Sequence, residues 1–143
     1  MIKVSTGKYK IEEEVEAFNG ETEQSYKFTM QITHSEYKEI ENLFFNLEGV
    51  KLSKEIQDLE KEGNKDLVVT KTEELISLLT NTVEKITDIA FKEHKQKLKE
   101  TVGEYVYEEV VDEVVNFFMN MFLKKVTAQG TIIPIDLMKI TKN

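Results

Sequence analysis

Hydrophobic and polar residues alternate along two segments within the first 32 residues of the chain. A period of two is typical of a β-strand, because successive side chains point to opposite faces. The apolar positions of the first segment are Tyr9, Ile11, Val15 and Ala17, and those of the second are Tyr26, Phe28, Met30 and Ile32. Between the segments, Asn19 and Gly20 predict a two-residue type I′ turn in which both residues have positive φ. This turn places Ile11 opposite Phe28, so the sequence predicts an antiparallel hairpin with one apolar face.

A capping box predicts the first helix. In this motif a Thr side chain caps the start of the helix, and a Glu three residues later caps the Thr backbone in return. Thr33 and Glu36 have this spacing, and Gly49 suits the left-handed position that ends many helices. The apolar stripe between them is Tyr37, Ile40, Leu43, Phe44 and Leu47. A short helix is predicted over residues 53–60, followed by a solvated loop at 61–65.

A second capping box, Thr70 with Glu73, predicts a long helix that runs to about residue 100. Apolar residues recur along it at helical spacing and form one core stripe: Leu75, Leu78, Leu79, Val83, Ile86, Ile89 and Ala90. Gly103 is predicted to break or kink the chain after this helix, since glycine is a weak helix former.

The segment 104–125 carries two apolar rows instead of one. The first row is Val106, Val110, Val114, Phe118 and Phe122, and the second is Tyr107, Val111, Val115, Phe117 and Met121. One row covers one neighbouring element, so this helix has a face broad enough for two. We expect Val110, Val114, Phe118 and Phe122 to be buried against Leu79, Val83 and Ile86. Part of the second row, with Phe117 and Met121, is predicted to form a homo-oligomer contact or a groove for a partner.

These elements predict an α+β fold in which an N-terminal β-hairpin packs on a bundle of about three main helices. The whole chain, residues 1–143, is interpreted as one domain with a hairpin region at 1–33, a helical body at 34–126 and an extended tail at 127–143. A third strand is expected from residues 131–135 or 2–4.

The composition favours a folded protein that binds neither nucleic acid nor membranes. Of the residues, 40% are hydrophobic and 32% are charged, which is typical of a folded domain. The net charge is −8 and no residue is Arg, the preferred contact for phosphates and bases. No apolar segment has the length of a signal peptide or a membrane span, and there is no Cys, so the expected location is the cytoplasm.

Candidate chemistry is sparse. His34 and His94 lie far apart in the sequence and are interpreted as solvated surface residues, and no metal-binding spacing occurs. The glycines form neither a phosphate-binding loop nor a dinucleotide-binding motif, and no serine lies in a nucleophile motif. The carboxylate pairs, such as Glu108 with Glu109, fall on the polar face of a helix. The sequence therefore predicts no catalytic residue, no cofactor and no metal, and a protein that is not an enzyme.

Two surfaces are candidates for partner binding. The outer face of the first strand, Glu12, Glu14 and Glu16, either keeps an edge hairpin soluble or docks a basic partner. The aromatic and methionine-rich end of the last helix, with Phe117, Met119 and Met121, either belongs to the core or forms an adaptable binding surface.

The layout resembles that of small tail-assembly proteins of phages and prophages in AT-rich Gram-positive bacteria. A hairpin, KYKIEEEVEAF-NG-ETEQSYKFTMQIT, precedes a helical body and a short extended tail. The resemblance implies a non-enzymatic protein that binds an aggregation-prone tail component during assembly. It lies in the architecture and transfers no functional residue.

The first hypothesis is therefore a protein–protein interaction module, of the tail-assembly chaperone or minor structural protein kind. An acidic inhibitor or immunity-type protein that caps a basic partner is the alternative. A small hydrolase with an unrecognised site is the third reading.

Overall fold

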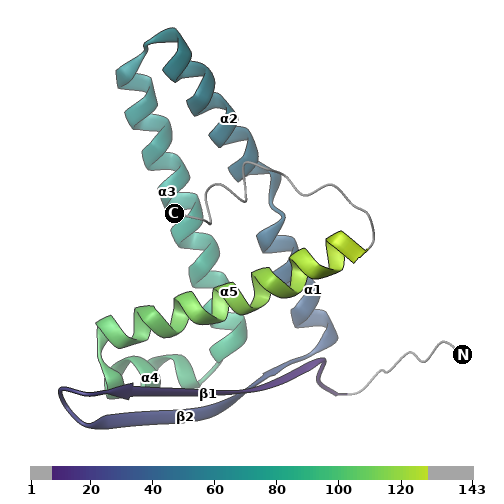
Figure 1. The fold of residues 1–143 in the computed structure, drawn as a ribbon, viewed down its shortest axis with the longest axis vertical. Helices are drawn as coiled ribbons and strands as arrows, with labels where there is room; N and C mark the ends of the chain where they lie inside the picture. Colours follow the sequence, from purple (N-terminus) through teal and green to yellow (C-terminus); the bar gives the residue numbers. More distant parts are fainter. Residues whose placement is uncertain (1–7, 129–143) are drawn as a thin grey trace, which may run out of the picture.

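The computed structural model describes residues 8–128, in which a β-hairpin is followed by five helices (Figure 1). The elements are β1 (Ile11–Asn19), β2 (Gln24–Ile32), α1 (His34–Phe44), α2 (Leu47–Glu62), α3 (Lys65–Phe91), α4 (His94–Val102) and α5 (Glu104–Ala128). The predicted α+β class is confirmed, with five helices where about three main ones were expected. The segments 131–135 and 2–4, each considered for a third strand, lie outside the described residues.

The hairpin has the predicted faces but a different register. Ile11 pairs with Ile32 and Asn19 pairs with Gln24, so four residues form the turn and the predicted pairing of Ile11 with Phe28 is wrong. Neither Asn19 nor Gly20 has positive φ; instead Glu23 does, at 56°. The register differs from the predicted one by four residues, an even number, so the same side chains remain on the buried face.

The Asn19 side chain explains the longer turn. Its Oδ1 accepts hydrogen bonds from the backbone N–H groups of Glu21, at 2.9 Å, and Thr22, at 3.3 Å. An Asn that bonds the backbone two residues further along forms a turn of its own, which replaces the type I′ turn expected of an Asn-Gly pair.

The first helix begins as predicted and ends earlier. The Thr33 hydroxyl accepts from the Glu36 N–H at 3.2 Å, and the Glu36 carboxylate accepts from the Thr33 N–H at 3.0 Å. The predicted stop at Gly49 is wrong, because α1 ends at Phe44 and Asn46 caps the start of α2. Gly49 lies inside α2, where a Cβ would come within 3.8 Å of a Leu78 methyl group on α3.

The long helix begins before the predicted capping box. Asn64 caps α3 by accepting from the Leu67 N–H at 3.3 Å, and Gly63 turns the chain with φ of 73°. Thr70 is therefore an interior residue, and its hydroxyl donates to the Asp66 carbonyl at 3.2 Å. The predicted helix start at Thr70 is wrong because Asn64 supplies an earlier cap.

The predicted helix to about residue 100 is two helices. Lys92 has φ of 51°, which is costly for a residue other than glycine and ends α3 at Phe91. The Lys92 ammonium donates to the Gln31 carbonyl and lies 3.1 Å from the Glu36 carboxylate, contacts that hold the turn in place. α4 follows and ends at the predicted break, Gly103.

The core lies where α5 meets the hairpin, α1 and the C-terminal end of α3. On α5 the predicted buried residues are confirmed: Val110, Val114, Phe118 and Phe122. Their neighbours differ in part from the expectation, since the Phe122 ring contacts Tyr37 and Phe44 of α1, with centroids 5.3 and 5.2 Å away. Ile86 is buried in the same core, whereas Leu79 and Val83 face the other row of α5.

The N-terminal half of α3 and all of α2 project from this body as a two-helix arm (Figure 1). Gly49 and Ser53 are the only buried residues on α2, and α3 has none before Ile86. The arm therefore consists of two helices whose apolar side chains remain partly exposed to solvent.

Candidate protein-binding site

Two rows of mostly apolar residues run along α3 with the 3-4 spacing of a coiled coil. The row that faces α2, here called the inner seam, is Val68, Lys71, Leu75, Leu78 and Thr82, all half-buried. The contact with α2 is shown by Leu78, which lies against Gly49, and by the Lys71 ammonium, 3.4 Å from the Glu55 carboxylate. Within residues 8–128, α2 thus covers the inner seam and leaves part of the adjacent row exposed.

The uncovered row, here called the outer seam, is Val69, Thr72, Ile76, Leu79 and Val83. Val69 is 58% exposed and Ile76 is 57% exposed, although neighbouring positions of the same spacing, Ile86 and Ala90, are fully buried in the body. A helix that carries two coiled-coil rows is built to lie between two other helices. Within residues 8–128, only one of these two helices is present along the arm.

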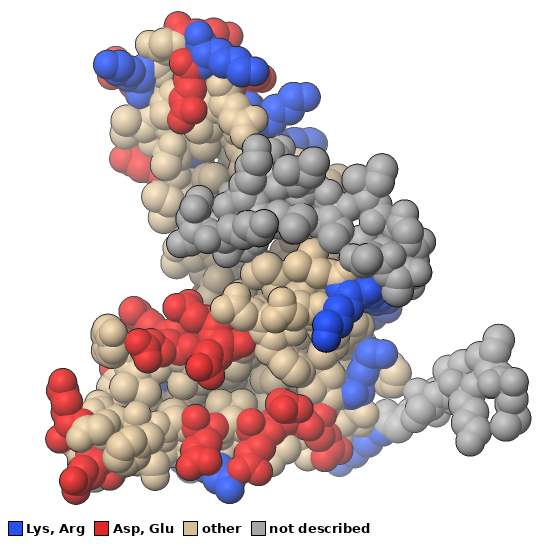
Figure 2. Space-filling view, in the orientation of Figure 1, with Lys and Arg blue, Asp and Glu red and all other residues tan. Residues whose placement is uncertain are grey.

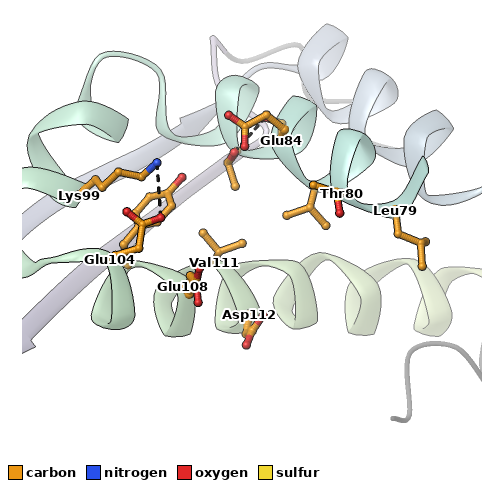
Figure 3. Close-up of a pocket in the computed structure, with 11 residues that line it drawn as sticks. Leu79, Thr80, Glu84, Lys99, Glu104, Glu108, Val111 and Asp112 are labelled. Atoms are coloured by element: carbon orange, nitrogen blue, oxygen red, sulfur yellow. Dashed lines mark hydrogen bonds and ion pairs between the residues drawn. The ribbon is translucent and has the colours of Figure 1, made fainter. Parts of the chain in front are cut away.

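The base of the outer seam opens into a groove between α3, α4 and α5 (Figure 3). The groove has a volume of about 410 Å³. Leu79 and Val83 of α3 face Tyr107 and Val111 of α5 across an apolar floor, so the second row of α5 is used here. Thr80 lies at the α3 edge of the groove.

The rim of the groove is acidic. Four carboxylates surround the apolar floor: Glu84, Glu104, Glu108 and Asp112. Of these, Glu108 and Asp112 have no Lys or His nitrogen within 4.0 Å among the described residues. The groove therefore has an apolar floor and an uncompensated negative edge.

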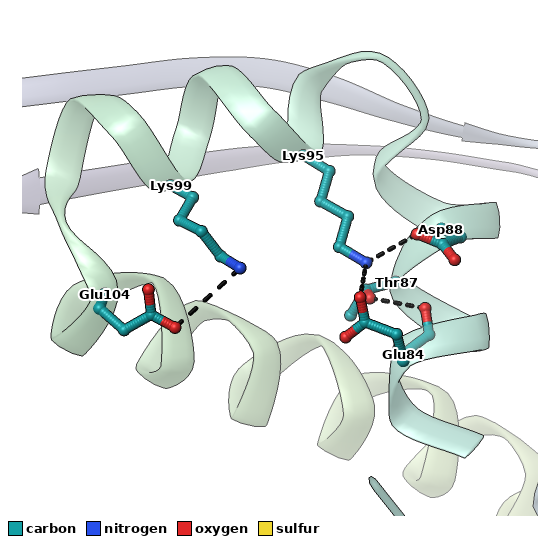
Figure 4. A network of polar contacts seen from close by, with 6 residues as sticks. All are labelled: Glu84, Thr87, Asp88, Lys95, Lys99 and Glu104. Carbon is teal, nitrogen blue, oxygen red and sulfur yellow. Dashed lines mark hydrogen bonds and ion pairs between the residues drawn. The ribbon is translucent and has the colours of Figure 1, made fainter. Parts of the chain in front are cut away.

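The lysines beside the groove are already engaged (Figure 4). The Lys95 ammonium lies 2.7 Å from the Glu84 carboxylate and 2.6 Å from that of Asp88. Burial lowers the pKa of Lys95, but the hydrogen bonds to these two carboxylates outweigh it, so its pKa lies above the ordinary value. Lys99 lies 4.0 Å from Glu104, and its ammonium sits 4.9 Å from the centre of the Tyr107 ring. These contacts hold α4 against α3 and α5.

The acidic rim belongs to a wider pattern. Figure 2 shows acidic side chains gathered over the N-terminal half of α5 and along the hairpin, whereas both signs are mixed at the tip of the arm. This end of the molecule would attract positively charged groups, with a strength that falls as salt screens the charges.

The residues predicted for partner binding lie outside the groove. Glu12, Glu14 and Glu16 are exposed on the outer face of β1, where Glu14 forms an ion pair of 2.6 Å with Lys27. The three predicted residues of α5 are half-buried: Phe117, Met119 and Met121. The Phe117 ring packs on that of Phe118, with centroids 5.5 Å apart. The structure brings none of these six residues to the rim or floor of the groove.

His94 has a structural role that the sequence did not indicate. Its ring stacks on Phe28 with centroids 4.7 Å apart, and its Nδ1 lies 2.6 Å from the Tyr26 hydroxyl oxygen. The interpretation of His94 as a solvated surface residue holds only in part, because its side chain is 33% exposed but also packs against β2.

Within residues 8–128, no three His, Asp or Glu side chains come together as a metal site. None of the helices in that range combines the length and apolar character that a membrane crossing needs. No protein-family model matches the chain, and neither a curated protein nor a solved structure is significantly similar to it.

Proposed function

We propose that this chain is a non-enzymatic protein-binding module that holds an amphipathic helix of another protein along the outer seam. The observation that carries the proposal is the coiled-coil row from Val69 to Val83. Val69 and Ile76 are exposed, Thr72, Leu79 and Val83 are half-buried, and the same row continues into the buried Ile86 and Ala90. A helix laid on this row would complete a three-helix arrangement with α2 and α3.

The length of the seam suits a short helical segment. Val83 lies fourteen positions after Val69, which at 1.5 Å per residue corresponds to about 21 Å, or about four turns. A partner helix of this length is marginal in water by itself, so docking would both order it and shield its apolar face. That behaviour fits an assembly factor for an aggregation-prone protein, the role implied by the resemblance to phage tail-assembly proteins.

A fluorescence titration tests the proposal. The chain has no Cys, so Glu73→Cys provides a single site for an environment-sensitive dye at an exposed position beside the seam. The probe is an 18-residue peptide with Leu at the a and d positions, Gln and Ala elsewhere, and no charge. We expect saturable binding that weakens by roughly tenfold or more when Ile76→Asp is added, because a buried unpaired carboxylate is costly.

Leu47→Asp is the matched control, since Leu47 is also an exposed apolar residue of the arm but lies on α2. This substitution should leave the peptide affinity unchanged. Equal losses in the two variants, or no saturable binding to the parent chain, would contradict the proposed function.

A further inference from the structure

We propose that the partner helix carries Lys or Arg at one end and seats that end in the groove between α3, α4 and α5. This inference rests on the proposed function and adds the chemistry and the placement of the partner.

The outer seam and the groove form one continuous track. Leu79 and Val83 belong to both, and Ile76 lies one helical turn further along α3 towards the tip of the arm. α5 crosses α3 at the foot of the arm (Figure 1). A helix laid along the seam therefore ends against α5, with its last turn over the apolar floor.

Charge differs between the two ends of this track. At the groove, the Glu108 and Asp112 carboxylates lack a cation within the described residues, and the nearest lysines are held by other carboxylates. Along the arm, Lys71 is paired with Glu55 and Glu74, at 3.4 and 3.5 Å. Lys or Arg side chains at one end of a partner helix would meet two neighbouring unpaired carboxylates there, whereas the exposed Glu73 is a single carboxylate beside the seam.

The charges at the two ends of the track also disfavour a second copy of this chain as the partner that binds there. Antiparallel pairing of two arms would bring the tip of one arm into the groove of the other. The tip carries Lys61 and Lys65, but also Glu62 and Asp66, so it has no net charge to offer the acidic rim. A separate protein with a basic, amphipathic helix fits the track better.

Three peptides test the inference, each derived from the neutral 18-residue probe and carrying one Trp. The chain has no Trp, so the emission reports on the peptide alone. One peptide has three Lys in its last turn, one has three Lys in its first turn, and one has three Glu in its last turn. At low salt we expect the tighter-binding of the two Lys peptides to have a roughly tenfold higher affinity than the Glu peptide. The ratio of these two affinities should fall towards one in 0.5 M salt.

Paired variants locate the effect. Glu108→Gln with Asp112→Asn removes two charges at the rim. This pair should reduce the preference for Lys, which is the ratio of the Lys-peptide affinity to the Glu-peptide affinity, at least threefold. Glu109→Gln with Glu113→Gln removes two charges from the same helix away from the groove and should leave the preference nearly intact. Equal effects of the two pairs would overturn the placement of the basic end.

The remaining outcomes are also decisive. Binding of the neutral peptide with no preference for Lys would overturn this inference and leave the proposed function standing. Failure of every peptide would contradict both. A dimer in sedimentation that Ile76→Asp dissociates would make a second copy the occupant, and binding that appears only after deletion of residues 129–143 would assign the track to the chain itself.

Discussion

The side chain of Asn19 donates a hydrogen bond from Nδ2 to the backbone carbonyl oxygen of Val102, at 2.7 Å, across 83 positions of the chain. The other polar atom of this side chain, Oδ1, accepts hydrogen bonds from two backbone N–H groups of the hairpin turn. Asn19 thus shapes the turn and fixes it to the C-terminal end of α4, where the last carbonyl groups of a helix have no partner within it.

Asn19→Ala should therefore destabilise the protein by about 1–2 kcal/mol, because three hydrogen bonds are lost together. Gly20→Ala is the control. Gly20 does not have positive φ, and an added Cβ would meet only a Phe18 ring carbon at 3.9 Å, so we expect a change within about 0.5 kcal/mol. Urea unfolding measures both. A larger loss for Gly20→Ala than for Asn19→Ala would favour the two-residue turn that the Asn-Gly pair suggests.

Adjacent phenylalanines of α5 should differ in their contribution to stability. Phe118 is fully buried, so Phe118→Ala should cost roughly 3–5 kcal/mol in the free energy of unfolding. Phe117 is half-buried and packs against the edge of the core, and Phe117→Ala should cost less than about 2 kcal/mol. Comparable losses measured by chemical denaturation would show that the second row of α5 is as deeply packed as the first.

The Glu36 carboxylate should make stability depend on pH in the acid range. Burial raises its pKa, but hydrogen bonds from the Thr33 backbone N–H and the Lys92 ammonium outweigh burial, so the pKa lies below its ordinary value. The stabilisation is present above the unfolded-state pKa and is lost as the pH falls from about 5 towards 3.

Glu36→Gln is the matched variant, because Gln can keep the capping hydrogen bond but does not titrate there. The difference in melting temperature between the two proteins should shrink as the pH is lowered through this range. A difference that grows on acidification would mean that the carboxylate is not the form stabilised in the folded protein.

The arm should open more readily than the body. No apolar side chain on α2, or on α3 before Ile86, is buried, and local opening is easiest where few apolar contacts hold a segment. Hydrogen exchange followed by mass spectrometry should show faster deuterium uptake over residues 47–80 than over residues 106–122. Equal protection of the two regions in the free protein would indicate that another chain already covers the arm.

The sequence predicted the class of fold because its strongest patterns are local. Alternation in the hairpin, the capping box at Thr33 and Glu36, and the first apolar row of α5 each reappear in the structure. Two of the wrong details share a physical cause, which is the choice between competing caps. Asn19 binds nearby backbone N–H groups, so the turn differs from the two-residue turn predicted from Asn19 and Gly20. Asn64 does the same, so the helix begins before the start predicted at Thr70.

The candidate site was missed for the same reason. A helix that begins at Thr70 does not contain Val69. Ile76 is also absent from the single apolar stripe predicted from Leu75 to Ala90. The two interleaved rows become visible once α3 begins at Lys65. The groove itself depends on how α4 turns back at Lys92 to bring α5 against α3, and no pattern in the sequence predicted that turn.

The central claim is that the outer seam of α3 binds a helix, and methyl NMR tests it most directly. With Ile, Leu and Val methyl groups labelled, titration with the neutral 18-residue peptide should shift the signals of the outer seam, above all Val69, Ile76 and Leu79. The methyl signals of Val50 and Ile56 on α2 should not shift. Shifts confined to the apolar end of α5 around Leu123, or no shifts at saturating peptide, would contradict the account.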